Sequence, residues 1–349
     1  MDVNARVIPL SLHPLGFIEA FTQLGAPLDG LLRDTGIDRS MLQHKDVRIS
    51  YAQQRRLLRN GVSLCRRPGL GLQVGMLFDW CYHGTVGYVV YCSPSLKAAG
   101  EAFYRYRVIA QPHYATSKVR PAGYVDRNGQ YVLPISRFAR EAASDPEMAR
   151  FLTELRLAII VRFWDACGNK SVPDPSVHVR LGYPEPDYAE LYQRLPCSTV
   201  TFGCAHTEVA AHHSVIVEEF RLYRRRAFQR LLEQCERELR QSRLQLRFSE
   251  QVRTYIGLNF HCQPTLEDTA RALGTTPRGL ARRLAAERTS FRNIQREVRL
   301  EWTMHHLRLS RLGVEEISRL MGFSCAASLR RAVKAASGKT VSAIRSGGG

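Results

Sequence analysis

Apolar residues recur every three or four positions through much of the first third of the chain, which is the spacing of an amphipathic helix. Residues 8–75 contain the segments PLGFIEAFTQLG and PLDGLLRDTG, and each ends in a glycine suited to a helix stop. SYAQQRRLLRNGVSLC follows with Ser50 as its expected cap, and another helix is expected to start near Ser93 or Ser95. The pattern predicts a helical layer.

The pattern changes to alternation between polar and apolar positions over residues 113–138, which is typical of strands. Asn128 and Gly129 stand where a two-residue hairpin turn belongs, so an antiparallel strand pair is expected. SDPEMARFLTELRLAIIVRFWDACG then has the spacing of an amphipathic helix, and residues 175–216 return to strand, turn and short helix. The predicted fold class of this part of the chain is α+β.

One long helix is predicted from Val215 to Gln241. Apolar residues recur by four and three along one side of it, at Ile216, Phe220, Tyr223 and Ala227. Such a stripe can pack on its own domain or pair two copies of the chain, and both alternatives stay open at this point. A polar hinge follows, so the predicted domains are residues 1–241 and 245–349.

The stretch from Pro264 to Arg345 contains the same pattern twice, as PTLEDTARALGTTPRGLARRL and as VEEISRLMGFSCAASLRRAVK. In both copies an apolar helix carries a small residue, Ala270 or Ser318, four places before a glycine that can end the helix in a left-handed turn. A polar cap and a second helix follow. This is the helix-turn-helix pattern, placed at residues 265–286 and 313–335, within an all-α C-terminal domain.

The second helix of each copy has an apolar side and a basic side. Leu280 and Leu284 share a face in the first copy, as Leu329 and Val333 do in the second, and both pairs are expected to be buried. The basic residues on other faces are free to meet a partner: Arg278, Arg282 and Arg283, then Arg330, Arg331 and Lys334. Residues 290–310 between the copies predict a long linking helix of roughly 30 Å, close to one turn of duplex DNA.

Charge favours a polyanionic partner. The chain has 349 residues and a formal net charge of +18, and residues 251–349 hold 17 Lys and Arg against 7 Asp and Glu. A positive domain with this helix pattern points to double-stranded DNA rather than to a membrane surface. No basic-then-apolar signal and no run of membrane-spanning length is present in the sequence, so the expected location is the cytoplasm, on the nucleoid.

Nine cysteines are scattered without a CxxC pair, so reduced thiols are expected. One cluster combines residue types that bind metals: Cys197, Cys204, His206, His212 and His213. Its spacing fits no zinc pattern. We therefore expect neither a metal nor a cofactor.

The last hundred residues resemble the DNA-binding domain of AraC/XylS-family transcription regulators. The resemblance is carried by Leu266, Ala270, Gly274, Leu280, Arg282, Leu284, the TSF at 289–291, the EVRLE from Glu297, the ISRLMGFS from Ile317, and Gly338. Departures lie near the end, where Leu329, Val333 and Ile344 stand in place of the family's usual aromatics, and Thr340-Val341 in place of its Ser-Pro.

This resemblance implies which residues contact DNA. The positions that match the family's base contacts are Arg278, Ala281 and Arg282 in the first copy and Ala327, Arg330 and Arg331 in the second. Arg283 and Lys334 are expected to touch phosphate instead.

The N-terminal part also resembles a known domain. GTVGYVVYCSPSLKAAGEAFYRY, GYPEPDYAELYQRL and VTFG are similar to segments of the arabinose-binding-type domain of AraC regulators of the ornithine-utilisation-regulator kind, over residues 10–215. This implies ligand sensing and dimerisation, although no ligand-binding residue can be named. The expected protein is a homodimeric transcription activator that responds to a small-molecule effector or partner and works with RNA polymerase on promoter DNA.

Two other classes of protein are alternatives. An enzyme with an accessory helix-turn-helix is disfavoured because the sequence has no GxGxxG after a strand, no GxSxG and no HExxH, and the GKT at 338–340 has Val333 where a P-loop needs glycine. A catalytic group assembled from distant residues would escape such a search. A DNA-architectural protein without sensing would bind duplexes without sequence preference.

Overall fold

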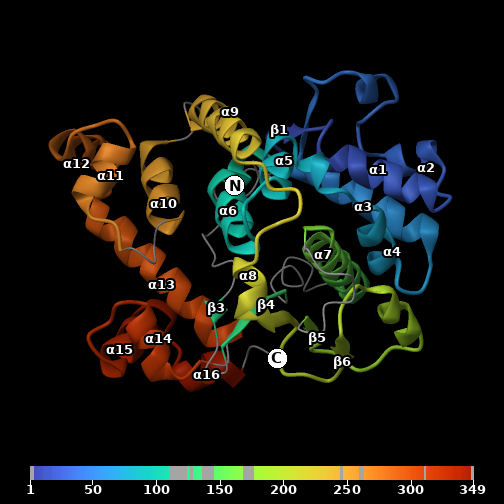
Figure 1. Cartoon of the computed structure of the whole chain (residues 1–349). Coiled ribbons are helices and arrows are strands. Elements are labelled where there is room, and N and C mark those ends of the chain that lie inside the picture. The colour runs from blue at the N-terminus through green and yellow to red at the C-terminus, as the bar shows by residue number, and fades with distance from the viewer. Residues whose placement is uncertain are drawn as a thin grey trace. The chain divides into compact units, whose positions relative to one another are not determined.

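The computed structural model describes residues 4–110, 124–125, 129–135, 145–167, 177–243, 247–258, 263–309 and 312–346. The chain divides into two compact units (Figure 1). Unit 1 comprises Met1–His113 and Gly123–Glu238, and unit 2 comprises Tyr114–Ala122 and Leu239–Gly349. The division after Glu238 falls inside one helix, α9 (Arg225–Arg243), so this helix begins in unit 1 and ends in unit 2.

The first part of unit 1 is mainly helical, as the apolar spacing predicts. Its elements are β1 (Arg6–Pro9), α1 (His13–Gln23), α2 (Leu28–Leu32), η1 (Ser40–Gln43), β2 (Arg48–Ser50), α3 (Tyr51–Cys65), α4 (Leu70–Leu77), η2 (Trp80–His83), α5 (Thr85–Tyr91) and α6 (Leu96–Ala110). Ser50 caps α3, since its hydroxyl accepts from the backbone N–H of Gln53 at 3.2 Å. The antiparallel β1–β2 pair was not predicted, because strands of four and three residues are too short to produce a periodic signal.

A five-stranded sheet forms the second part of unit 1, and it confirms the α+β prediction for this part of the chain. Its strands are β3 (Tyr124–Val125), β4 (Gln130–Pro134), β5 (His178–Arg180), β6 (Thr199–Thr201) and β7 (Glu208–His212), in the order β3-β4-β7-β5-β6. All neighbours are antiparallel except β5 and β6. β3 and β4 are the expected strand pair, while Asn128 of its turn lies outside the described residues.

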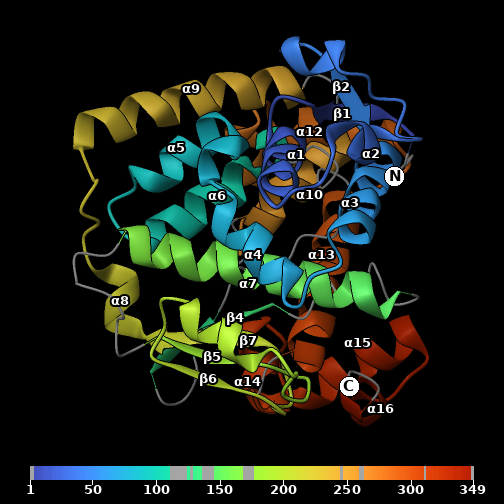
Figure 2. The same ribbon diagram turned by 90° about the vertical axis from the view of Figure 1, so that its right-hand side faces the viewer.

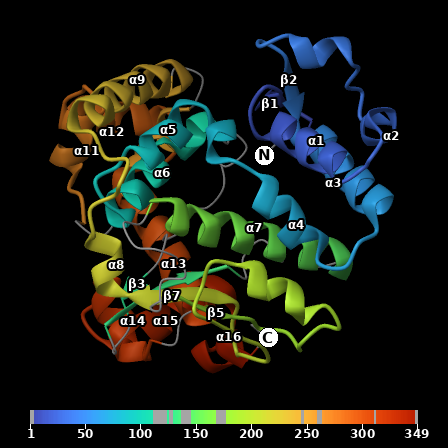
Figure 3. The same ribbon diagram turned by 45° about the vertical axis from the view of Figure 1, so that its right-hand side comes forward.

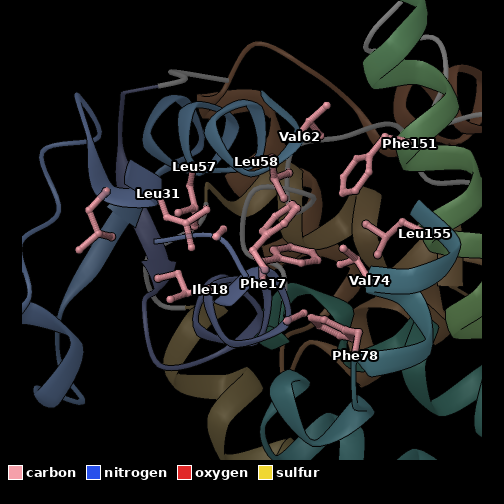
Figure 4. Close-up of a cluster of buried hydrophobic side chains, with 14 of the residues drawn as sticks. Phe17, Ile18, Leu31, Leu57, Leu58, Val62, Val74, Phe78, Phe151 and Leu155 are labelled. Carbon is pink, nitrogen blue, oxygen red and sulfur yellow. The ribbon is translucent and has the colours of Figure 1, made fainter. Parts of the chain in front are cut away.

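Helix α7 (Pro146–Cys167) joins the two parts of unit 1 (Figure 3). Its Phe151 and Leu155 pack with side chains of α1, α2, α3 and α4 in one apolar core (Figure 4). Its Leu157 and Val161 belong to a second core, which includes Val209 of the central strand. One helix therefore supplies both cores, which fits its mostly buried sequence.

Two glycines of α4 allow α4 to approach α7 closely. A Cβ placed on Gly71 would lie 2.3 Å from the carbonyl oxygen of Phe151, and one on Gly75 would lie 2.6 Å from that of Leu155. Both distances are far below van der Waals contact with backbone atoms. These two positions must therefore stay glycine while the helices keep this separation.

The GYPEPDYAELYQRL segment includes the short helix η5 (Ala189–Arg194) and is fastened to α7 by tyrosines. The hydroxyls of Tyr188 and Tyr192 donate to the buried carboxylate of Glu154 at 2.8 and 2.9 Å. Burial raises the pKa of Glu154, and the two hydroxyls act in the opposite direction. This segment is accordingly part of the packing of unit 1.

The prediction of one helix from Val215 to Gln241 is wrong. The chain forms α8 (His213–Val217) and α9, and between them the backbone N–H of Phe220 donates to the carbonyl of Pro94 at 3.1 Å. The Phe220 side chain is only 5% exposed and packs in the second core against Phe163. The helix is interrupted where this ring is buried, so Ile216, Phe220, Tyr223 and Ala227 do not lie along one continuous helix.

Unit 2 is helical throughout the part that the structure describes. Its helices are α10 (Phe248–Leu258), α11 (Leu266–Ala272), α12 (Pro277–Ala286), α13 (Phe291–Leu309), α14 (Val314–Leu320), α15 (Ala326–Ser337) and α16 (Val341–Ser346), together with the end of α9. The long linking helix predicted over 290–310 is α13. Among the described residues of the chain, no helix is both long and apolar enough to cross a membrane.

Unit 1 buries two neutral histidines beside each other. His13 and His83 are 3% and 5% exposed, and their rings stack with centroids 6.4 Å apart. Burial lowers the pKa of His13 to about 4, and burial together with the neighbouring His13 lowers that of His83 to about 3. In the unfolded chain both bind protons near 6.5, so unit 1 loses stability as the pH falls below 6.5 toward about 4.

Replacing His83 with Phe should make the free energy of unfolding less dependent on pH in this range. The variant removes one proton that the unfolded state binds and the folded state does not, which corresponds to about 1.4 kcal/mol per pH unit. Urea denaturation from neutral to acid pH measures the slope. The exposed His44→Gln should keep the wild-type slope, and equal slopes for wild type and His83→Phe would contradict the assignment.

Candidate nucleic-acid interface

Helices α11 and α12 form the first helix pair of unit 2. Thr265 caps α11, because its hydroxyl accepts from the N–H of Asp268 at 3.1 Å. Gly274 follows α11 with φ of +64°, the left-handed conformation that glycine adopts without strain. Thr276 then accepts from the N–H of Gly279 at 3.0 Å, and Pro277 occupies the first position of α12. The local signals in the sequence therefore have their expected geometry.

Helices α14 and α15 form the second helix pair with the same order of features. The carboxylate of Glu316 accepts from the N–H of Gly313 at 2.7 Å at the start of α14. Gly322 has φ of +68° between the helices, and Gly338 has φ of +69° at the end of α15. The N–H of Gly338 donates to the carbonyl of Lys334 at 2.9 Å and ends the helix.

Both pairs bury the residues expected to be inside. Leu280, Leu284, Leu329 and Val333 are each 0% exposed. Ala270 and Ser318, the small residues of the first helices, are also buried. All eight residues assigned to a partner are exposed: Arg278, Ala281, Arg282, Arg283, Ala327, Arg330, Arg331 and Lys334. Each second helix thus has an apolar face turned inward and a basic face open to solvent.

The exposed arginines differ in what they contact. Within the described part of the chain, no contact engages the side chains of Arg278 and Arg282. The Arg283 guanidinium lies 3.6 Å from the centre of the Phe248 ring, so it packs on α10. Arg330 pairs with Glu315 at 3.4 Å, and both side chains are more than half exposed. Arg331 donates to the Ser328 hydroxyl at 3.4 Å.

Helix α10 is fixed to the first helix pair by a contact that the sequence analysis missed. The Glu287 carboxylate at the end of α12 accepts from the backbone N–H groups of Phe248 and Ser249 at 2.8 and 2.9 Å. Partial burial acts to raise the pKa of Glu287, but these hydrogen bonds outweigh it and the pKa is lowered. The partners are 38 and 39 residues apart, so no local pattern could reveal them.

Helix α13 is the spine of unit 2. Ile294 and Val298 are buried near its start, and Thr303 and Leu307 near its end. Arg253 of α10 forms ion pairs with Glu297 and with Glu301, the latter at 3.2 Å. Helix α13 packs against α14 and α15 of the second pair, and α10, which packs on α13, contacts α11 and α12 of the first pair. The two basic faces therefore belong to a single packed unit.

Ile344 of α16 is also buried, although it stands where the resembling family has an aromatic residue. Leu329 and Val333, the other two departures, are buried with it. Arg345 of α16 donates to the carbonyl of Leu312 just before α14. The aliphatic residues thus fill the interior of the second pair.

Cys325 is an exposed thiol at the cap position of α15. Its sulfur lies 3.4 Å from the Ser328 hydroxyl, and this hydrogen bond with the nearby backbone N–H groups lowers the pKa of the thiol to about 7. In unit 1, burial instead raises the pKa of Cys197 to about 11. No group of three or more His, Cys, Asp or Glu side chains among the described residues is arranged to hold a metal ion.

Three comparisons place the chain among known proteins. Residues 25–216 match the arabinose-binding domain of AraC transcription regulators, an N-terminal domain. An ornithine utilization regulator of Pseudomonas aeruginosa is 27% identical over 352 residues, covering 99% of this chain and 98% of that protein. Two uncharacterized HTH-type transcriptional regulators, from Mycobacterium bovis and Mycobacterium tuberculosis, are each 23% identical over 324 residues and cover 90% of both chains.

The crystal structure of the transcriptional regulator CdpR from Pseudomonas aeruginosa aligns with a TM-score of 0.40 at 18% identity, covering 83% of this chain and 90% of that one. The relatives that span nearly the whole chain are regulators of transcription. The family domain matches just over half of the chain, and most of the matched residues belong to unit 1. This protein therefore belongs to the AraC family of transcription regulators that carry the N-terminal arabinose-binding domain.

Proposed function

We propose that the protein is a sequence-specific DNA-binding transcription activator whose two helix pairs are helix-turn-helix motifs. The observation that carries the proposal is the repeated arrangement of α12 and α15, in which two apolar residues one turn apart are buried and the basic residues are exposed. A helix of this kind fits the major groove and presents its side chains to base edges. The partners are then promoter DNA and RNA polymerase, in the cytoplasm.

The length of α13 supports simultaneous binding of both helices to one duplex. Its 19 residues correspond to about 28 Å at the rise of an α-helix. Successive major-groove faces on one side of DNA are roughly 34 Å apart. A rigid spine of this length suits two recognition helices that enter adjacent grooves.

The contacts of the arginines rank them as base readers. Arg282 has a side chain that no described contact restrains, and its fork matches the O6 and N7 acceptors of guanine. Arg283 and Phe248 are partners in a cation–π contact, so Arg283 suits a phosphate contact that leaves this stacking in place. Arg330 would exchange an exposed ion pair with Glu315, which is worth about 0–1 kcal/mol, for a contact with DNA.

Arg282→Ala and Arg331→Ala should each relax the preference for one or two bases in their own half of the binding site. Each bidentate arginine–guanine contact is worth about 1–3 kcal/mol of discrimination. Selection of binding sites from a random duplex library with each variant measures the change, and we expect the larger loss from Arg282.

Lys334→Ala is the matched control, since loss of a phosphate contact should weaken all sequences alike. An unchanged base preference with uniformly lower affinity would make the arginine in question a backbone contact. Equal affinity of the wild type for selected and random duplexes would favour the architectural alternative.

The match of unit 1 to an arabinose-binding domain supports a small-molecule effector. One relative is named for ornithine utilization, which makes amino acids and polyamines a first choice of compounds beside sugars and small acids. A ligand at 100 times its dissociation constant stabilises the folded state by about 2.7 kcal/mol. We expect one of these compounds to raise the unfolding temperature of the full chain, and no shift across all of them would count against a sensing role for these classes.

We also propose that the protein is a homodimer formed through unit 1, because regulators with two-fold sites present their DNA-binding units in pairs. Phe220 is buried in unit 1, so Tyr223 and Ala227, which are only partly buried, are the residues of the expected stripe that remain candidates for the interface. Sedimentation equilibrium of the full chain should show a dimer at micromolar concentration. A monomer at high micromolar concentration would exclude it.

A further inference from the structure

Helix α9 is anchored to unit 1 through one of its sides (Figure 2). Cys235 is fully buried. The Glu236 carboxylate accepts from the Tyr106 hydroxyl at 2.7 Å, and that of Glu238 accepts from the Thr85 hydroxyl at 2.8 Å. These contacts tie α9 to α5 and α6, so its orientation within unit 1 is fixed.

The opposite side of α9 is a row of arginines. Arg226, Arg230, Arg237 and Arg240 are all exposed, and at 3.6 residues per turn their side chains fall within a sector of about 80°. The four residues, named the arginine face below, span about 21 Å along the axis. Glu233 is the one exposed acidic residue of this helix.

The helix does not neutralise this row with its own carboxylates. Glu236 also pairs with Arg105 of α6, and Glu238 faces Thr85, so both carboxylates are used on the inner side. The Arg237 guanidinium donates to the Gln234 amide oxygen at 2.6 Å, while no described contact engages the other three guanidinium groups. Glu233 leaves the face with a net charge of +3.

This arrangement excludes a membrane surface as the partner. A basic amphipathic helix binds lipid by burying its apolar side in the bilayer. The apolar side of α9 is already turned inward, since Cys235 and Leu239 are fully buried. What remains available is charge alone, and guanidinium groups bind phosphate oxygens in a bidentate manner.

The chain connects α9 directly to unit 2. Helix α9 ends at Arg243 and α10 begins at Phe248, and five residue steps reach at most about 18 Å. The last turn of α9, which carries Arg240, is therefore separated from α10 by only a short stretch of chain. Duplex DNA carries one charge per about 1.7 Å, so a 21 Å row runs beside roughly a dozen phosphates.

We propose that the arginine face of α9 binds the phosphate backbone of duplex DNA that flanks the sequence read by α12 and α15. The inference rests on the proposed function. It assigns to α9, the helix that begins in unit 1 and ends in unit 2, a direct and sequence-independent contribution to DNA affinity.

The test compares the full-length wild type with the triple variant Arg226→Gln, Arg230→Gln, Arg240→Gln on two duplexes. One ends at the edges of the selected site, and the other extends it by about two helical turns on both sides. Each lost phosphate contact lowers the slope of log affinity against log salt by about 0.9. We expect the variant to lose about 2.7 of slope on the extended duplex and none on the short one.

A matched control removes the same charge from unit 1 outside α9, as Arg33→Gln, Arg56→Gln, Arg67→Gln, all of them exposed residues. It should bind both duplexes as the wild type does, with an equal unfolding temperature for all three proteins. Equal slopes for the arginine-face variant and the wild type, or equal losses in variant and control, would overturn the proposal. Unchanged DNA binding with lost transcription would overturn it in favour of an acidic protein partner.

The proposed function has its own readout in the same experiment. Preference of the wild type for the selected site over random duplex tests it on the short DNA, where the arginine face makes no contact. If the wild type shows no preference on the short duplex, the proposed sequence-specific binding is wrong. If that preference is present but the variant and the wild type have equal salt slopes on the extended duplex, only the proposed role of α9 is wrong.

Discussion

Unit 2 depends on the burial of two apolar side chains, one helical turn apart, on each of α12 and α15. A fully buried leucine contributes about 1.5–3 kcal/mol, so Leu280 and Leu284 fix the rotation of α12 about its own axis. Once that rotation is set, every other side chain of the helix has a determined direction. Burial of the leucines leaves the basic residues on the exposed side of the helix. The same apolar contacts that stabilise unit 2 therefore also orient the basic side chains toward the proposed DNA partner.

The surrounding contacts keep that rotation in place. Glu287 connects the end of α12 with the start of α10, and Arg283 stacks on Phe248 of the same helix. Both residues therefore connect the first helix pair to α10. Arg283 therefore contributes to packing, and its removal would change this packing as well as the proposed phosphate contact.

Much of unit 2 and little of the connection to it could be predicted from the sequence. The caps at Thr265 and Thr276 and the turn at Gly274 depend on neighbours a few residues away, and such local signals are visible in a single chain. The break before α9 depends on Pro94, more than a hundred residues earlier. The break is stabilised by the hydrogen bond between Phe220 and Pro94 and by burial of the Phe220 ring, and the spacing of apolar residues in the sequence predicts neither contact.

The same distinction holds for the candidate site. The helical period gave the exposed sides of α12 and α15 correctly, since exposure follows from the buried pair on each helix. It could not give the partners of those residues, such as Glu315 beside Arg330, because they come from other helices. For α9 the period was assigned to a helix that begins ten residues too early, so its true inner side, marked by Cys235 and Glu236, was missed.

Gly71 and Gly75 have a consequence for genetic screens of this regulator. Every missense change from a glycine codon adds a Cβ, and even alanine at Gly71 would place that atom 2.3 Å from a backbone oxygen of α7. Random mutagenesis should therefore return both positions among the strongest loss-of-function alleles. Such alleles would report a displaced helix, and they would resemble effector-blind mutants although neither glycine has a side chain with which to hold an effector.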